Sequence, residues 1–163
     1  MYFDVDNKMI SGLPVAQFLQ GNGRFVGVGG KVSLQLWPRV RANLGVGLVN
    51  AELVSTRESL PRIPPLRGQL SLDVPYQQFT VSPEWTFAAR QNHVFRNETT
   101  TDGYSVFNRK ASYVLSTVHM AHIVSATAYN LTNELYRHHM SVTKDFISQI
   151  GRGIKVSYSI RFF

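Results

Sequence analysis

Apolar and polar residues alternate strictly along several segments of the chain. In residues 40–48 every even position is apolar and every odd position is polar or glycine, and residues 154–162 repeat this split. The segments 26–36, 70–74 and 79–89 follow the same two-residue period. Successive side chains of a β-strand point to opposite faces of the sheet, so this period predicts strands with one apolar and one polar face.

The links between these segments alternate between short and long. We expect short links at 37–39, 76–78 and 116–118, and long links at 6–23, 55–66, 91–103 and 132–151. The long links are rich in Gly, Asn, Pro, Ser, Thr and charged residues, as irregular loops are. Short turns at one end and long loops at the other are typical of the antiparallel hairpins of a transmembrane barrel.

The length of the strands favours a membrane barrel. A tilted strand needs about 9 to 11 residues to cross a bilayer, whereas strands of soluble proteins are most often about five or six residues long. Trp37, Tyr76, Phe162 and Phe163 lie at the short-turn end, where a barrel places an aromatic belt. A soluble antiparallel sandwich, whose inward faces alternate in the same way, stays open as the alternative.

Two residues interrupt the alternation. Arg109 falls in the apolar phase of its segment, and an Arg that faces lipid in mid-bilayer costs about 2 to 4 kcal/mol. We therefore expect Arg109 near a membrane interface, or a β-bulge that shifts the phase. Pro83 removes one backbone donor from its strand and predicts a bulge there as well.

Composition and charge exclude several classes of protein. The 163 residues are 44% hydrophobic, enough to fold, and include no cysteine for disulfides or thiolate metal sites. A net charge of +7 is compatible with nucleic-acid binding, but the basic residues are spread along the chain and predict none. No nucleophile elbow, phosphate loop or zinc-protease motif occurs, so we expect no enzyme, no catalytic residue and no cofactor.

Motifs in the last third of the chain resemble those of TonB-dependent outer-membrane receptors. They comprise residues 91–98, 101–104 and 130–139, then Ser141, Lys144, Asp145, Gly151 and Arg152, in the family's order. Upstream, 60–67 looks like the proline-rich entry to a strand of these receptors, and 24–27 resembles an earlier strand start. The resemblance implies an all-β fold, an antiparallel up-and-down segment of a 22-stranded transmembrane barrel. Residues 1–163 would form about seven strands of its C-terminal portion, with 2–5 as the stump of another.

The same resemblance implies a function. Such receptors import scarce nutrients, such as ferric siderophores or metal complexes, across the Gram-negative outer membrane and are energised through TonB. This chain would supply barrel wall, extracellular loops and the assembly signal, and the plug domain and signal peptide would belong to a longer polypeptide. The expected partners are outer-membrane lipid and lipopolysaccharide, the plug and remaining strands, the barrel-assembly machinery, TonB and a small-molecule ligand. A soluble binding module, or a small autonomous barrel with a structural role, is the alternative.

Loop residues are the candidates for ligand contact. They are His93, Arg96, Arg137, His138 and His139, which all fall in long links. Adjacent histidines on a strand point to opposite faces, so the sequence predicts no metal site.

The C-terminal residue is the candidate assembly signal. Barrel proteins often end in Phe, with apolar residues at every second position before it. Phe163 ends this chain, but the alternating set stops at Phe162. Either Phe162 serves in register, or the terminus contains a bulge.

Overall fold

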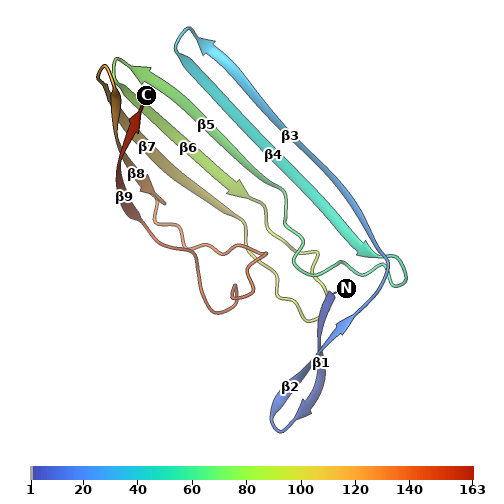
Figure 1. The fold of residues 1–163 in the computed structure, drawn as a ribbon. Coiled ribbons are helices and arrows are strands. Elements are labelled where there is room, and N and C mark those ends of the chain that lie inside the picture. The colour runs from blue at the N-terminus through green and yellow to red at the C-terminus, as the bar shows by residue number, and fades with distance from the viewer. Residues whose placement is uncertain (1) are drawn as a thin grey trace.

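The structure is a computed structural model that describes residues 2–163, apart from the side chains of 2–8, 14 and 16–19. Seven antiparallel strands form one sheet in chain order, as the alternation predicts (Figure 1). They are β3 (Gly23–Trp37), β4 (Val40–Leu53), β5 (Arg67–Tyr76), β6 (Phe79–Ala88), β7 (Tyr104–Ser116), β8 (Met120–Tyr129) and β9 (Gly153–Phe162). Each strand pairs with the next one in the sequence, so the sheet is an up-and-down meander without crossovers.

The links between the strands are short at one end of the sheet and long at the other (Figure 1). The short turns cover 38–39, 77–78 and 117–119, and the long loops cover 54–66, 89–103 and 130–152. We refer to the last three as the first, second and third long loops. The C-terminus lies at the short-turn end, as expected for an up-and-down barrel segment.

The N-terminal part differs from the prediction. The prediction of a long loop at 6–23 is wrong, because β1 (Tyr2–Ile10) and β2 (Leu13–Leu19) form a separate two-stranded sheet. Ser11 and Gly12 make the turn between them with φ angles of 53° and 80°. Positive φ at both central residues is the geometry of the two-residue turns that join twisted strands. The stump expected at 2–5 is a strand, but it pairs with β2 rather than with the main sheet.

The predicted bulge at Pro83 is wrong. β5 and β6 pair Ser71 with Glu84 and Val74 with Val81, so the register is the same on both sides of the proline. The proline interrupts the ladder locally, because it lacks a backbone N–H, but it inserts no residue.

The bulge considered for Arg109 is also wrong. β6 and β7 pair without a break from Phe79 and Tyr113 to Ala88 and Tyr104. Arg109 therefore keeps its phase and stays on the apolar face of the sheet. Its position near a membrane interface stays a prediction.

One face of the seven-stranded sheet is apolar and exposed. Val28 of β3 is 73% exposed, Val46 of β4 is 41% exposed and Val156 of β9 is 68% exposed. In a sandwich these inward-facing side chains would be buried by a second sheet. Their exposure contradicts the sandwich alternative and agrees with a barrel wall.

The opposite face carries hydrogen-bonded polar side chains that cross several strands. Asp73 accepts hydrogen bonds from Asn43 at 3.1 Å and from Ser82 at 2.7 Å. Glu84 accepts hydrogen bonds from Gln69 at 2.5 Å and from Asn108 at 2.8 Å. Polar side chains on this face thus join β4 to β6 and β5 to β7, as a water-exposed lumen allows.

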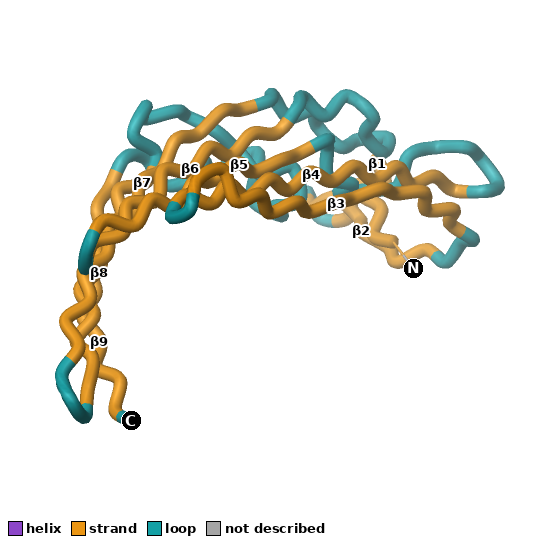
Figure 2. Tube along the Cα trace, turned by 90° about the horizontal axis from the view of Figure 1, so that it is seen from above, coloured by secondary structure: helices purple, strands orange, loops and turns teal. Residues whose placement is uncertain are grey.

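The sheet is curved rather than flat. Seen along its edge, the strands follow an arc in which β8 and β9 turn away from β3 and β4 (Figure 2). An aromatic side chain packs directly over a glycine of the neighbouring strand: a Cβ added to Gly68 would lie 2.6 Å from the Phe87 ring. Such glycines let strongly twisted strands approach closely, and the ring covers the backbone that glycine exposes.

Candidate functional site

The three long loops meet at one end of the sheet, and we call them together the rim. A small apolar cluster lies beneath them, formed by Ala51, Leu53, Leu60 and Phe95, with Ile63 packed against it. Phe95 comes from the second loop and Leu60 from the first, so this cluster joins two loops to the end of β4.

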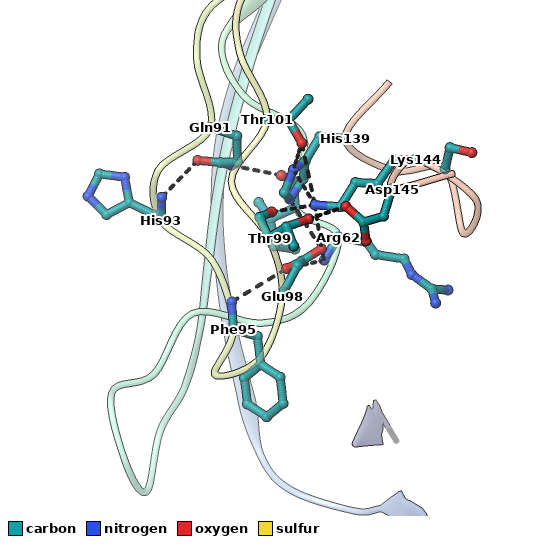
Figure 3. A network of polar contacts seen from close by, with 12 residues as sticks. Arg62, Gln91, His93, Phe95, Glu98, Thr99, Thr101, His139, Lys144 and Asp145 are labelled. Atoms are coloured by element: carbon teal, nitrogen blue, oxygen red, sulfur yellow. Dashed lines mark hydrogen bonds and ion pairs between the residues drawn. The ribbon is translucent and has the colours of Figure 1, made fainter. Parts of the chain in front are cut away.

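A buried polar network joins the loops above this cluster (Figure 3). Glu98 of the second loop accepts a hydrogen bond from the Arg62 amide of the first loop at 3.1 Å. Its Oε1 atom also lies 3.3 Å from His139 Nε2 and 3.6 Å from Lys144 Nζ of the third loop. The Glu98 side chain is 11% exposed, so one carboxylate ties all three loops together away from water.

Lys144 is the second centre of the network. It is 5% exposed, and its ammonium group donates to the Thr99 carbonyl at 2.5 Å and to His139 Nδ1 at 3.1 Å. The neighbouring Asp145 accepts a hydrogen bond from the Thr99 hydroxyl. A buried lysine is tolerated only when its charge is paired and its donors are used, and both conditions hold here.

The contacts of His139 define its protonation state. An ammonium group can only donate, so Nδ1 accepts from Lys144 and the ring proton lies on Nε2, facing Glu98. The Nε2 atom is buried and makes no well-aligned hydrogen bond within the described residues, so its interaction with Glu98 is mainly electrostatic. Burial, and then the Lys144 charge, lower the pKa of His139, although Glu98 and Asp145 oppose the shift. The ring is therefore neutral at pH 7.

Three rings form a second cluster beside the network. Tyr104, at the start of β7, lies 4.5 Å from Tyr136 and 5.6 Å from His138, measured between ring centroids. The Tyr104 hydroxyl is 3.1 Å from His138 Nδ1. Burial lowers the pKa of His138, and the charge of Arg67 adds to this effect. The cluster thus presents neutral rings close to an arginine.

Asn130 fixes the base of the third loop. It is 1% exposed, and its side-chain amide donates to the Glu134 carbonyl at 2.9 Å and accepts from the Glu134 amide at 2.8 Å. Asn133 plays a similar part, because its side chain accepts from the Arg152 amide at 3.0 Å. Both asparagines have positive φ, which Asn tolerates better than most residues. The Asn-Leu-Thr-Asn motif therefore has a structural role in closing the loop.

The predicted ligand contacts occupy different environments. His93 lines a cavity of about 340 Å³ between the first and second loops. Arg137 lines a polar cavity of about 190 Å³ together with Tyr136 and Asp145. His138 belongs to the ring cluster, where a narrower cavity of about 30 Å³ is enough for about one water molecule.

The other two predicted contacts are engaged by the rim itself. Arg96 forms an ion pair with Glu58 at 3.2 Å and lies 5.0 Å from the centre of the Phe95 ring. His139 is 4% exposed and contacts the buried network. Ligand contact by any of the five residues remains a prediction.

The sequence did not single out Glu98 and Lys144 as the centres of a buried network. Both lie in segments that resemble the receptor family, which was the available signal, but the two residues are far apart in sequence. Among the residues whose side chains are described, no group of three or more His, Asp and Glu side chains is arranged to hold a metal ion. The described part of the chain has no helix that is long and apolar enough to cross a membrane.

The C-terminal strand continues in register to its last residues. Phe162 pairs with Met120, and the Phe163 amide donates to the His119 carbonyl at 3.2 Å. The pairing of β8 with β9 has no irregularity, so the terminal bulge is wrong and Phe162 lies in the apolar phase. A role for Phe162 and Phe163 in assembly remains a prediction.

Solved structures show what the fold resembles. The copper transporter OprC superimposes with a TM-score of 0.82 at 20% sequence identity, over 95% of this chain and 26% of that protein. BauA, the ferric preacinetobactin receptor from Acinetobacter baumannii, superimposes with a TM-score of 0.67 at 20% identity, over 97% of this chain and 25% of that protein. No protein-family model and no curated protein sequence matches the chain.

These likenesses decide the fold. Both neighbours are TonB-dependent receptors, which are transport proteins and not enzymes. The chain spans about a quarter of the length of each neighbour. The resemblance expected from the motifs is confirmed at the level of the fold, since the described sheet matches a section of their barrels. The seven-stranded sheet has the fold of part of a TonB-dependent receptor barrel.

Proposed function

We propose that the chain is the C-terminal part of the barrel of an outer-membrane importer of scarce nutrients, energised through TonB. The observation that carries this proposal is the exposed apolar face of a seven-stranded meander whose backbone superimposes on receptor barrels. Lipid would cover the apolar face, and the polar face would line a lumen that holds a plug domain. Metal complexes or siderophores are the proposed cargo, because the names of the two neighbours specify such ligands.

The proposed orientation places the rim outside the cell. Barrels of this architecture have short periplasmic turns and longer extracellular loops. The three long loops would therefore meet the ligand, and the C-terminus would lie in the periplasm with Phe162 and Phe163 available to the assembly machinery.

Labelling of the full-length receptor in its native host tests location and orientation together. We expect a peptide tag inserted in the third long loop, after Val142, to be labelled on intact cells. A matched tag between Gln77 and Gln78 should be labelled only after permeabilisation. The unheated protein should also run anomalously on a denaturing gel, as closed barrels do. Labelling of both tags on intact cells, or recovery of the protein outside the outer membrane, would contradict the proposal.

Arg137 is the proposed ligand contact with the best access. It is exposed and lines the polar cavity of about 190 Å³, whereas His139 is buried. An arginine recognises carboxylate or other anionic groups of a chelate through paired hydrogen bonds. We expect Arg137→Ala to weaken uptake about tenfold, the effect of one charged hydrogen bond. Arg57→Ala, which removes an exposed charge from the first long loop, should leave uptake unchanged.

A further inference from the structure

Arg109 is a cation on the apolar face of the sheet. It pairs directly with Pro83 of β6 and with Ala128 of β8, and neither pairing contains a register shift at this point. The next residues of the same phase along β7 are Phe107 and Ala111. The charged side chain is exposed and has only apolar neighbours on this face.

Nothing within the described side chains neutralises this charge. No hydrogen bond or ion pair of the Arg109 guanidinium occurs among them, whereas Arg24, Arg90 and Arg96 each pair with an acid. A guanidinium keeps its charge at any physiological pH. The charge of Arg109 is therefore open to an anion from outside the chain.

Aromatic pairs on the same face lie on either side of Arg109 along β7. Trp85 stacks on Phe107 at 6.1 Å, and Phe79 contacts Tyr113 at 4.7 Å. The two pairs are separated by six residues of β7, about 20 Å along a strand, or about 15 Å across a bilayer at the usual tilt of about 40°. This separation is shorter than the apolar band of a barrel, which is about 25 Å tall, so the two pairs do not mark both interfaces; the Trp85–Phe107 pair lies on the side of the long loops.

Arg109 lies close to the Trp85–Phe107 pair. It is two residues from Phe107, so its Cα lies about 5 Å deeper in the membrane. The Trp85 indole N–H donates to Ser105 at 2.7 Å, toward the long loops, which is the orientation of an indole whose polar edge faces the interface. An arginine side chain extends about as far as this offset, so the Arg109 guanidinium reaches the level of the Trp85 indole, which the proposed orientation places at the headgroups of the outer leaflet.

We propose that Arg109 binds a phosphate group of lipid A on the outer surface of the barrel. The planar guanidinium matches phosphate with two parallel hydrogen bonds, and a phosphate at the interface supplies the charge that the chain lacks. This inference rests on the proposed outer-membrane location and orientation, because only then is the leaflet beside Arg109 built of lipid A. It gives a physical reason for an arginine in the apolar phase.

Lipid binding by the full-length receptor tests the proposal. We expect native mass spectrometry of the purified receptor, titrated with lipid A, to show about tenfold weaker binding for Arg109→Gln than for wild type. Lys110→Gln is the matched control, because it removes the same charge from the adjacent residue on the polar face, where Lys110 pairs with Ser82 and Thr127. It should bind lipid A as wild type does.

Two further measurements keep the result interpretable if Arg109→Gln fails to assemble. Wild type should bind dephosphorylated lipid A about tenfold more weakly than lipid A, and Arg109→Lys should fall between wild type and Arg109→Gln. Equal binding of both lipids, or equal binding by Arg109→Gln and Lys110→Gln, would overturn the lipid A proposal alone. Equal binding to phosphatidylglycerol would show a general anion contact and would also overturn it. A receptor absent from the outer membrane would overturn the proposed function and this inference together.

Discussion

The sheet and the rim are stabilised in opposite ways. In the sheet, backbone ladders connect each strand to its sequence neighbour, and the side chains on both faces stay largely open to their surroundings. In the rim, backbone pairing is sparse, and a buried carboxylate, ammonium and imidazole connect loops from distant parts of the sequence. The sheet therefore depends on a repeated pattern, whereas the rim depends on a few individual residues.

This difference predicts where single substitutions have large effects. Removal of one partner from a buried charge network leaves the other charge uncompensated, at a cost of about 3 to 5 kcal/mol. A substitution on an exposed strand face lowers the stability only when it places a charged side chain in lipid or an apolar side chain in water.

The largest effect is expected for Lys144→Met. The variant leaves Glu98 without its cation and removes one of the donors to His139 Nδ1, so the closed rim should lose about 3 to 5 kcal/mol relative to opened loops. Hydrogen exchange of the full-length receptor should show faster exchange in residues 89–103 and 130–152. Lys155→Met, which removes an exposed charge from the polar face of β9, should leave exchange in the rim unchanged. Equal exchange in both variants would mean that the network does not hold the loops.

A smaller effect is expected when an arginine is placed on the apolar face of the sheet. Val156→Arg should destabilise the membrane-inserted receptor by about 2 to 4 kcal/mol, because the charge would face hydrocarbon. Ser157→Arg is the control, since the adjacent side chain points to the polar face. Denaturant unfolding in lipid vesicles measures both. Similar losses in the two variants would contradict the assignment of the faces.

The same contrast explains what the sequence could predict. Five of the seven strands and their faces follow from a two-residue period that each of them carries within its own residues. β7 keeps this period apart from Arg109, and β8 follows it only loosely, so the order of short and long links predicts these two strands as well. The hairpin of β1 and β2 was not predicted, because residues 2–19 do not alternate strictly between apolar and polar residues and Ser11-Gly12 is not one of the Asn-Gly, Asp-Gly or Gly-Gly dipeptides that most strongly indicate a two-residue hairpin turn. The bulge predicted at Pro83 failed because a missing N–H interrupts a ladder without adding a residue.

The rim could not be predicted in the same way. Lys144 donates a hydrogen bond to Thr99, 45 positions away in the sequence, and contacts Glu98, the residue before Thr99. No local period encodes such a pair. The family-like motifs include Glu98 and Lys144. They do not indicate that the His139 side chain is buried in the network while Arg137 lines an open cavity.

The smallest expected effect is a dependence of rim closure on pH. The pKa of His139 is lowered in the closed rim, by burial first and by Lys144 second, from an ordinary value of 6.5. The closed state thus binds fewer protons than the opened state. The contribution of neutral His139 to the stability of the closed rim is therefore fully present above pH 6.5 and is lost as the pH falls below that value. Because His139 is a single titrating group, the free energy of rim closure can change by at most about 1.4 kcal/mol per pH unit.

Hydrogen exchange in the third long loop between pH 7.5 and 5.0 measures this dependence, after correction for the intrinsic exchange rate. We expect His139→Gln to flatten it, because a neutral amide can still accept from Lys144 but cannot gain a proton. His138→Gln should flatten it less: burial also lowers the pKa of His138, but its ring is more exposed. If His138→Gln removes more of the slope than His139→Gln, the proton-sensitive group of the rim is the ring cluster and not the buried network.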